Sequence, residues 1–175
     1  MPVKEVIRMG HPILKCVALP VTEFNTLKLD TLIRDMLDTM EALDGAGLAA
    51  PQIAVLERVV IFGINHNPRY PDVEPIPTTI LINPEITVLG NNSENAWEGC
   101  LSLPGMRGLV PRPTNIKYSG FDQSGNKIES NAINFHARVV LHEVDHLDGI
   151  LYPERIQNLK DFGYEDQMQE QLLTN

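Results

Sequence analysis

The chain is poor in basic residues and in cysteine, and it contains no long apolar run. Its 14 lysine and arginine residues are outnumbered by 23 aspartate and glutamate residues, so the formal net charge is −9 at pH 7. A phosphate backbone would be repelled by that balance, which argues against direct reading of nucleic acid and, more weakly, against a role at anionic membranes. Because no apolar stretch approaches the roughly 20 residues of a membrane span, we expect no membrane segment.

The only two cysteines are Cys16 and Cys100. They could form one disulfide, but residues 1–5 (MPVKE) lack the charged and then apolar start of a signal peptide. We therefore expect a cytoplasmic protein, in whose reducing surroundings each cysteine is a thiol. Cys16, between a lysine and a valine, is expected to pack as a small apolar residue.

Length and composition are those of one globular domain. Of the 175 residues, 43% are hydrophobic and 21% are charged, so the chain can bury a core without disulfide or metal staples. The sequence shows no internal repeat. We expect residues 1–175 to form a single domain, with a polar tail from about residue 152 onward.

Hydrophobic periodicity predicts two helices. Apolar residues at helical spacing indicate an amphipathic helix that ends near Gly45, with a stripe of Leu29, Leu32, Ile33, Met36, Leu37 and Met40. A second helix is expected at about 135–148, again from apolar residues three and four apart. The polar tail after it is expected to be a short helix or a frayed end.

Strands are expected between the two helices. A buried strand at 58–64 is followed by a proline-rich loop at 65–78. Further strands are expected at 79–82, 86–89, 115–121 and 127–133, with a hairpin turn at 122–125. Because the strands are grouped and do not alternate with helices, the fold class is expected to be α+β, with antiparallel or mixed sheets packed around the second helix.

The second predicted helix carries the sequence HEVDH at residues 142–146. Two histidines four residues apart lie on one face of a helix, so His142 and His146 can reach the same metal ion. The carboxylate of Glu143 can then stand beside a water on that metal. The pattern indicates a site that activates water, and hydrolysis is the first reaction class to test. Taken alone, it is short enough to occur by chance.

A catalytic metal site usually has three protein ligands and one open position, so a third ligand is needed. One protease arrangement places a third histidine six residues after the second, and here that position is Tyr152. Another arrangement uses a glutamate farther along the chain, for which the sequence offers Glu154, Glu165 and Glu170. Cys100, in the turn-rich segment EGCLSLPG at 98–105, is the stronger candidate, because a thiolate with two imidazoles suits zinc or ferrous iron.

A third segment, GAGLAAPQ at residues 45–52, is dense in small residues. Such residues let the backbone of a ligand approach closely, and Gln52 adds an amide that can donate a hydrogen bond. By itself this segment would equally fit a tight connection between a helix and a strand.

These three segments, in this order, resemble the motifs of the peptide deformylases. That family carries a Gly-x-Gly-x-Ala-Ala-x-Gln loop, a Glu-Gly-Cys-x-Ser segment and a His-Glu-x-x-His helix, which appear here as GAGLAAPQ, EGCLSLPG and HEVDHLDG. The resemblance runs from the turn at residues 10–12 to about Leu151. Each motif is modestly specific, but three together at these spacings are very specific.

The resemblance implies one divalent metal ion held by Cys100, His142 and His146, with the fourth position left to water. In this family the metal is typically ferrous iron, and zinc or nickel can occupy the site. Glu143 would act as the general acid/base. Gln52 and the backbone N–H of Leu101 would stabilise the oxyanion.

The resemblance also implies the substrate. The activity would be removal of the formyl group from the N-terminal formylmethionine of newly made polypeptides, with release of formate. The backbone at Ala46, Gly47 and Gly99 would pair with the extended peptide. Val139, on the helix one turn before His142, is expected to line the methionine pocket. A transient contact with the ribosome stays open, although the acidic chain offers no basic tail for it.

Two other functions stay open from the residues alone: a zinc endopeptidase with a downstream glutamate ligand, and a metal-binding or peptide-binding protein without turnover. One position departs from many family members, which carry glutamine where this chain has Leu141. Because that residue adjoins the first histidine ligand, hydrogen bonding around the ligand is expected to differ there.

Overall fold

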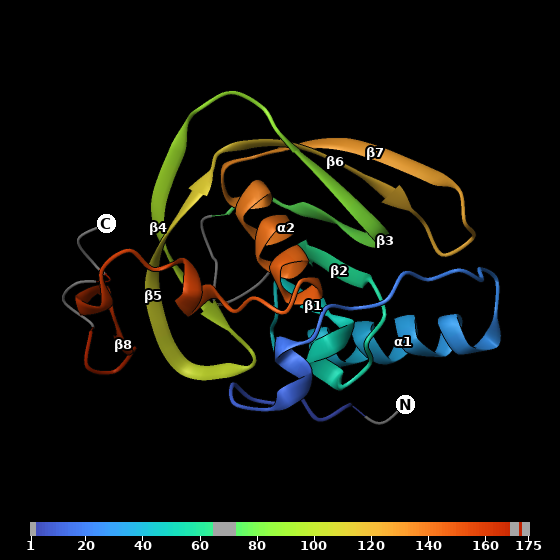
Figure 1. The fold of residues 1–175 in the computed structure, drawn as a ribbon, viewed down its shortest axis with the longest axis horizontal. Coiled ribbons are helices and arrows are strands. Elements are labelled where there is room, and N and C mark those ends of the chain that lie inside the picture. The colour runs from blue at the N-terminus through green and yellow to red at the C-terminus, as the bar shows by residue number, and fades with distance from the viewer. Residues whose placement is uncertain (1–2, 65–72, 169–171, 173–175) are drawn as a thin grey trace.

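Two antiparallel sheets flank one central helix in the computed structural model, which describes residues 3–64, 73–168 and 172 (Figure 1). The larger sheet has the strand order β1-β2-β3-β6-β7, and the smaller sheet has the order β4-β5-β8. Helix α2 (Asn134–Leu147) lies between them and packs against strands of both, while α1 (Leu27–Ala42) covers β1 and β2. The expected α+β class with a central metal-motif helix is confirmed.

The strands are β1 (Gly47–Ala49), β2 (Val59–Ile64), β3 (Ile76–Val88), β4 (Ser93–Cys100), β5 (Leu103–Pro113), β6 (Asn115–Phe121), β7 (Lys127–Ile133) and β8 (Phe162–Tyr164). Four short 3-10 turns complete the fold at Pro12–Lys15, Ala50–Ile53, Tyr152–Arg155 and Leu159–Asp161. Within the described part of the chain, every helix is too short or too polar to cross a membrane.

Helix α1 forms where the apolar stripe predicted it. Thr26 begins it, because its hydroxyl accepts a hydrogen bond from the N–H of Leu29 at 3.2 Å. The helix ends at Ala42, before the expected end at Gly45, because Asp44 takes a left-handed φ of 50° and the Gly45 N–H returns to the Met40 carbonyl at 2.9 Å. Its apolar stripe packs on β2 and on the segment after β1.

The predicted hairpin at 115–133 is confirmed with the expected bounds. Its turn is held by Asp122, whose carboxylate accepts from the N–H groups of Ser124 and Asn126, each at 2.8 Å. Gly125 adopts a φ of +81°, a conformation that side chains disfavour. The turn chemistry that predicted the hairpin therefore also explains its geometry.

The two short strands expected at 79–82 and 86–89 are one strand, so that prediction is wrong. Strand β3 runs from Ile76 through Val88, with a register shift between Ile82 and Glu85 where Asn83 takes a φ of 50°. The amide of Asn83 bonds the backbone of Val21 as both donor and acceptor at 2.9 Å, which stabilises the bulge. The expected proline-rich loop is shorter than 65–78, since β3 already includes Ile76; its residues 65–72 lie outside the described residues.

The segment around Cys100 is not mainly turns, as the sequence indicated, but the end of a long hairpin. Strands β4 and β5 pair over most of their length, and Cys100 is the last residue of β4. The sequence did not predict β5 as a strand because the segment contains prolines. Pro111 and Pro113 are tolerated because β8 pairs only with the stretch from Met106 to Gly108, so the other edge of β5 needs no donor there.

The tail after Tyr152 contains two short 3-10 helices, Tyr152–Arg155 and Leu159–Asp161, in partial agreement with the expected short helix, but the strand over residues 162–164 was not predicted. These residues form β8, which adds a third strand to the smaller sheet. Met168 is buried against Gly163, so the chain stays packed to the end of its continuous described part. The tail thereby supports the hairpin that carries Cys100.

Candidate active site

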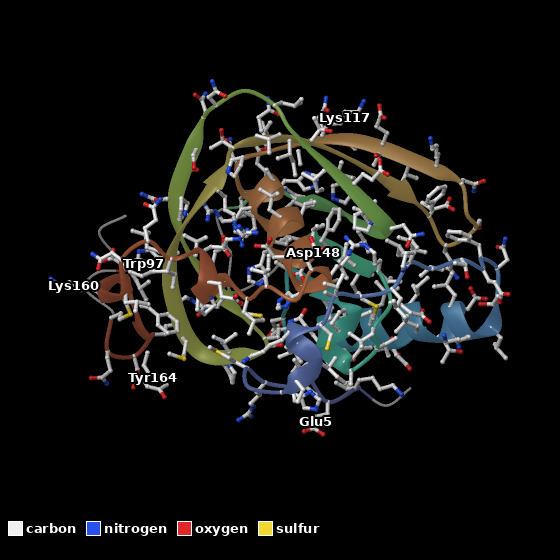
Figure 2. All side chains as sticks on the ribbon, in the orientation of Figure 1. Glu5, Trp97, Lys117, Asp148, Lys160 and Tyr164 are labelled. Atoms are coloured by element: carbon white, nitrogen blue, oxygen red, sulfur yellow. The ribbon has the colours of Figure 1, made fainter. Side chains whose placement is uncertain are left out.

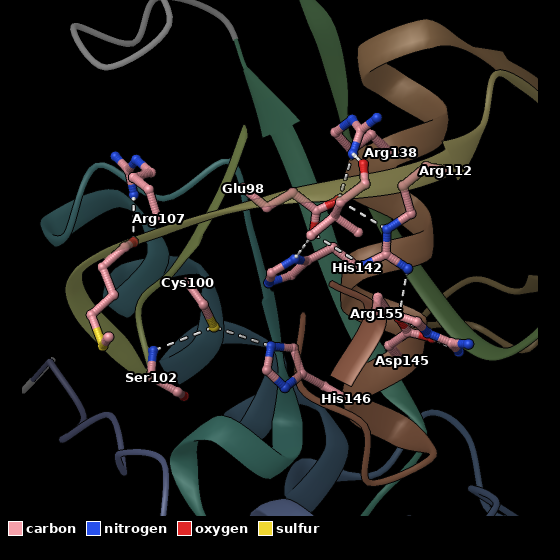
Figure 3. Close-up of polar contacts among 12 residues, drawn as sticks. Glu98, Cys100, Ser102, Arg107, Arg112, Arg138, His142, Asp145, His146 and Arg155 are labelled. Carbon is pink, nitrogen blue, oxygen red and sulfur yellow. Dashed lines mark hydrogen bonds and ion pairs between the residues drawn. The ribbon is translucent and has the colours of Figure 1, made fainter. Parts of the chain in front are cut away.

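Three side chains from two elements meet between the sheets. Cys100 comes from the end of β4, and His142 and His146 lie one turn apart on α2 (Figure 3). Their donor atoms all lie within 4.8 Å of one another, and the Cys100 Sγ is 3.3 Å from the His146 Nε2. The three side chains are 7%, 9% and 1% exposed, respectively. The structure therefore brings together the three ligands that the sequence predicted.

The sulfur of Cys100 receives two N–H donors. The amide of Gln52 and the backbone N–H of Ser102 each lie 3.4 Å from it. Gln52 is itself oriented, because its Oε1 accepts from the Ala49 N–H at 2.8 Å and its amide nitrogen also reaches the Ser102 hydroxyl at 3.2 Å. These bonds hold the sulfur in place beside the two histidines.

The two imidazoles have different surroundings. Glu98 Oε2 lies 2.8 Å from Nδ1 of His142, which leaves Nε2 as the atom available to the shared site. Burial lowers the pKa of His142, but hydrogen bonds to Cys100 and Glu98 raise it well above the ordinary value. Burial, followed by the positive charges of His142 and Arg112, holds the pKa of His146 well below the ordinary value.

Glu98 is the hub of a buried ion-pair network that the sequence did not predict. Arg112 donates to both of its oxygens at 2.9 and 3.0 Å, and Arg138 donates to Oε1 at 2.8 Å (Figure 3). Arg112 continues to Asp145 at 2.5 Å, and Arg155 closes the network on the same carboxylate. Although burial raises the pKa of Glu98, bonds from His142 and Arg112 lower it well below its usual range, so the carboxylate is ionised. The only sign in the sequence of a role for Glu98 was its place in the EGC motif beside Cys100.

Glu143 faces the same site from α2. It is 5% exposed, and burial raises the pKa of its carboxyl to about 7. Among the described residues its Oε2 has no hydrogen-bond partner. A Cβ at Gly47 would lie 2.6 Å from Oε1 of Glu143, so only glycine leaves room for the carboxylate there.

One pocket joins these groups. It is partly open to solvent. Of the ten residues predicted for the site, all but His146 line it: Ala46, Gly47, Gln52, Gly99, Cys100, Leu101, Val139, His142 and Glu143. The lining also includes residues to which the sequence assigned no role: Gly45, Trp97, Glu98, Phe135 and Arg138.

The alternative third ligands are placed elsewhere. Tyr152 is buried and its ring stacks on His142, with 6.0 Å between ring centroids. Glu154 accepts from the Leu151 N–H at 2.9 Å, and Glu165 pairs with Arg107 at 3.1 Å. Glu170 lies outside the described residues. Within the described ranges, Cys100 and the two histidines are the one group of three that could hold a metal ion.

Leu141, the departure beside the first histidine, is partly buried against the apolar cluster that contains Val140 and Ala137. Its side chain therefore contributes packing at a position where glutamine would offer hydrogen bonds. The orientation of His142 comes instead from Glu98, on the neighbouring sheet.

A buried cysteine sulfur, two imidazoles and a carboxyl group with a pKa near neutrality form the site of a metal-dependent hydrolase. The spacing of the donor atoms fits one cation, since ligands about 2.0 to 2.3 Å from an ion lie within a few ångströms of each other. The comparisons with known proteins agree. The family model described as polypeptide deformylase matches residues 3–162. The chain belongs to the polypeptide deformylase family, which is metal-dependent.

Similar proteins cover nearly the whole chain. Peptide deformylase 1 of Nitrosomonas europaea is 57% identical over 94% of this chain and 93% of its own length. Peptide deformylase 2 of Ralstonia nicotianae is 54% identical over 93% and 92%, respectively. Among solved structures, the class I type b peptide deformylase of Acinetobacter baumannii bound to Met-Ala-Ser is 41% identical over 89% of this chain and 99% of its own, with a TM-score of 0.85.

Proposed function

We propose that this chain removes the formyl group from the N-terminal formylmethionine of newly made polypeptides and releases formate. The observation that carries the proposal is the convergence of Cys100, His142 and His146 within 4.8 Å, in one pocket with Glu143. These three residues would hold one divalent cation. When bound, such a cation supplies a Lewis acid that lowers the pKa of water and polarises a carbonyl oxygen.

Glu143 is the proton carrier of the proposed reaction. A carboxyl group with a pKa of about 7 can take a proton and release it at neutral pH. It would accept the proton of the attacking water and deliver it to the amine nitrogen as the C–N bond breaks. The products are formate and a peptide with a free N-terminus, and Glu143 returns to its starting state.

Gln52 and Leu101 would stabilise the charge that develops on the formyl oxygen. The carbonyl end of the Gln52 side chain is held by the Ala49 N–H, which turns its amide nitrogen toward Cys100 and the pocket. Leu101 follows Cys100 directly, and it lines the same pocket. Donors fixed in this way act without reorganisation during the reaction.

The pocket also suits the substrate. The small residues Ala46, Gly47 and Gly99 let the backbone of a peptide approach closely, which favours pairing by strand addition. Val139 and Phe135 supply apolar walls for the methionine side chain. A formyl group is the smallest acyl group, so limited space near the metal ligands would disfavour bulkier acyl groups.

We further propose ferrous iron as the metal in the cell, with zinc and nickel as alternatives, because a set of one thiolate and two imidazoles suits all three. The iron form is expected to lose activity in air faster than the zinc or nickel form, since ferrous iron and a thiolate are both oxidisable. Equal aerobic lifetimes would contradict an iron–thiolate centre. A cytoplasmic location and a transient contact with the ribosome fit a substrate that is newly synthesised.

The test is the Glu143→Ala variant with formyl-Met-Ala-Ser as substrate. We expect it to retain its metal and to lose nearly all release of formate. The matched control is Glu129→Ala, on the exposed face of β7, which is expected to keep full activity. A fully active Glu143→Ala variant would remove Glu143 from the mechanism. Absence of formate release from the wild-type protein would instead favour a binding protein without turnover.

A further inference from the structure

A second hollow adjoins the active-site pocket. N-terminal residues 4–8 line one side of it, and Pro104, Gly105 and Arg107 of the hairpin line another. Cys100 and Leu101 line both hollows, so the two adjoin each other at these residues. We refer to the second hollow as the exit groove. A polypeptide whose methionine occupies the first pocket has to leave the site through adjoining open space, and this groove provides it.

The N-terminal segment is anchored beside the metal ligands. The N–H groups of Ile7 and Met9 donate to the carbonyls of Gln52 and Ser102, each at 2.9 Å. Both acceptor residues also contact the sulfur of Cys100. The segment is therefore fixed to the site itself and holds a constant position relative to the ligands.

The opposite edge of the same segment is unpaired at Val6 and at the Arg8 N–H. The Lys4 N–H donates to the Thr39 hydroxyl at 2.9 Å, and the Arg8 carbonyl accepts from the His11 N–H at 3.0 Å. Bonding through Ile7 and Met9, two residues apart, is the alternation of an extended chain, in which the intervening residues direct their backbone groups the other way. The N–H groups of Val6 and Arg8 have no hydrogen-bond partner among the described residues. Val6 and Arg8 both line the exit groove. An unpaired extended edge is a template for another chain.

We infer that the unpaired backbone groups of residues 6–8 form a second pairing edge, which binds the substrate polypeptide by strand addition from about its fourth residue onward. The inference rests on the proposed function, because the occupant is the downstream part of that substrate. It gives a role to a groove that shares Cys100 and Leu101 with the pocket and is lined by Val6 and Arg8.

Arg8 adds a preference for acidic residues in that part of the substrate. The groove is lined by three cations, Lys4, Arg8 and Arg107, and by two carboxylates, Glu5 and Glu165, but two of the cations are already paired. Lys4 pairs with Asp35 and Arg107 pairs with Glu165, each at 3.1 Å. Arg8 has no ion-pair partner within the described ranges and is exposed. Glu5 projects from the edge of the molecule (Figure 2).

Peptides of two lengths test the pairing edge. The value of kcat/KM is measured for formyl-Met-Ala-Ser and for an eight-residue peptide that begins with the same three residues. We expect the wild type to prefer the longer peptide about three- to tenfold, the effect of one or two hydrogen bonds. Val6→Pro removes an N–H that the fold leaves unused and is expected to abolish this preference with turnover of the short peptide unchanged. The control Val6→Ala keeps the N–H and is expected to keep the preference.

A test on the substrate leaves the protein unaltered. Single N-methyl groups placed along residues four to seven of the long peptide should lower kcat/KM at alternate positions only, as pairing along one edge requires. Equal kcat/KM for the short and long peptides, or equal effects of N-methylation at every position, would overturn the inference. Failure to turn over formyl-Met-Ala-Ser would instead overturn the proposed function.

The charge is tested with long peptides that carry either two glutamates or two lysines after residue four. The wild type is expected to prefer the acidic peptide about threefold, and Arg8→Glu is expected to reverse this preference. Arg34→Glu makes the same charge change on the exposed side of α1 and is expected to leave the preference in place. If both variants changed the preference equally, the groove would not be the path of the substrate.

Discussion

The two helices of the fold are of similar length but bury different chemistry. Helix α1 buries mainly an apolar stripe, with Asp35 and Thr39 as its polar exceptions. Helix α2 lies between two sheets and buries nine residues, of which five are polar or charged: Arg138, His142, Glu143, Asp145 and His146. Helix α1 mainly stabilises the fold, whereas α2 holds residues that we propose for the reaction. The polar residues of α2 are retained at a cost in stability.

That cost follows from the energetics of buried charge. Removing ions from water is unfavourable, and an ion pair in a protein interior rarely stabilises more than an apolar pair of the same size. The network from Glu98 to Arg155 is therefore weak evidence for stability but strong evidence for positioning, since Glu98 also holds His142. Mutations at α1, at α2 and at the residues that contact them should separate effects on stability from effects on positioning.

The largest effect is expected from Arg112→Met. It leaves Glu98 and Asp145 as buried charges short of partners, which should lower the free energy of unfolding by about 3 to 5 kcal/mol. Because Glu98 orients His142, metal affinity should also fall about 10- to 100-fold. Chemical denaturation and competition with a chelator measure the two effects.

The control is Lys117→Met, at the exposed pair with Glu129 across β6 and β7. Exposed ion pairs contribute little, so it should change stability by less than about 1 kcal/mol and leave metal affinity unaltered. Equal effects of the two variants would show that the network has no role in positioning the ligand.

On α1, the substitution Met36→Ala tests whether stability can fall without a loss of metal or activity. Met36 is fully buried, and its truncation leaves a cavity that should lower the free energy of unfolding by about 2 to 5 kcal/mol. Metal content and kcat with formyl-Met-Ala-Ser should stay at the wild-type level below the melting transition. A parallel loss of metal would mean that α1 also sets the geometry of the site.

At Gly47 the expected loss is in activity and not in stability. The added Cβ would meet the Glu143 carboxylate at 2.6 Å and displace it, and a shift of about 1 Å in a catalytic group can cost on the order of 100-fold in rate. Gly47→Ala should thus lower kcat about 100-fold. Gly45→Ala is the control, because its Cβ would meet a movable Leu101 side chain at 3.2 Å; a loss as large there would remove the steric argument.

The smallest expected effect concerns His136, at the start of α2. Burial against Phe62 and Tyr118 lowers its pKa below the ordinary 6.5. The unfolded chain therefore binds the proton more readily, so stability is present above pH 6.5 and is lost as the pH falls below it. His136→Phe should lose less stability than the wild type between pH 7.5 and 5.5 in urea denaturation. An identical pH dependence of the two proteins would contradict this.

The sequence predicted the structural features that depend on residues close together in the chain. The α1 stripe and the Asp122 turn each depend on neighbouring residues, and both are confirmed. The spacing of His142 and His146 is local too, and the structure brings both rings to one place with Cys100. The strands that were missed depend on distant partners. Strand β5 contains three prolines and β8 is very short, so only their pairing with each other and with β4 makes them strands.

The same distinction applies to the site. Motifs indicated the residues that we propose as metal ligands and proton carrier, because those residues are close together in the sequence or belong to short patterns. The contacts that orient them join residues far apart, such as Arg112 with Asp145 or Gln52 with Cys100, and no spacing in the sequence indicates them. The free backbone edge at Val6 is also visible only once the chain has folded.

The most direct measurement is the metal content of the anaerobically purified protein beside its two single-cysteine variants. Cys100 is buried at the end of β4, whereas Cys16 is exposed with its sulfur 3.4 Å from the Pro12 carbonyl. We expect about one divalent metal per chain in the wild type and in Cys16→Ala, with a large loss or a change of metal in Cys100→Ala. Unchanged metal in Cys100→Ala, or a collapse in Cys16→Ala, would contradict the assigned ligand set.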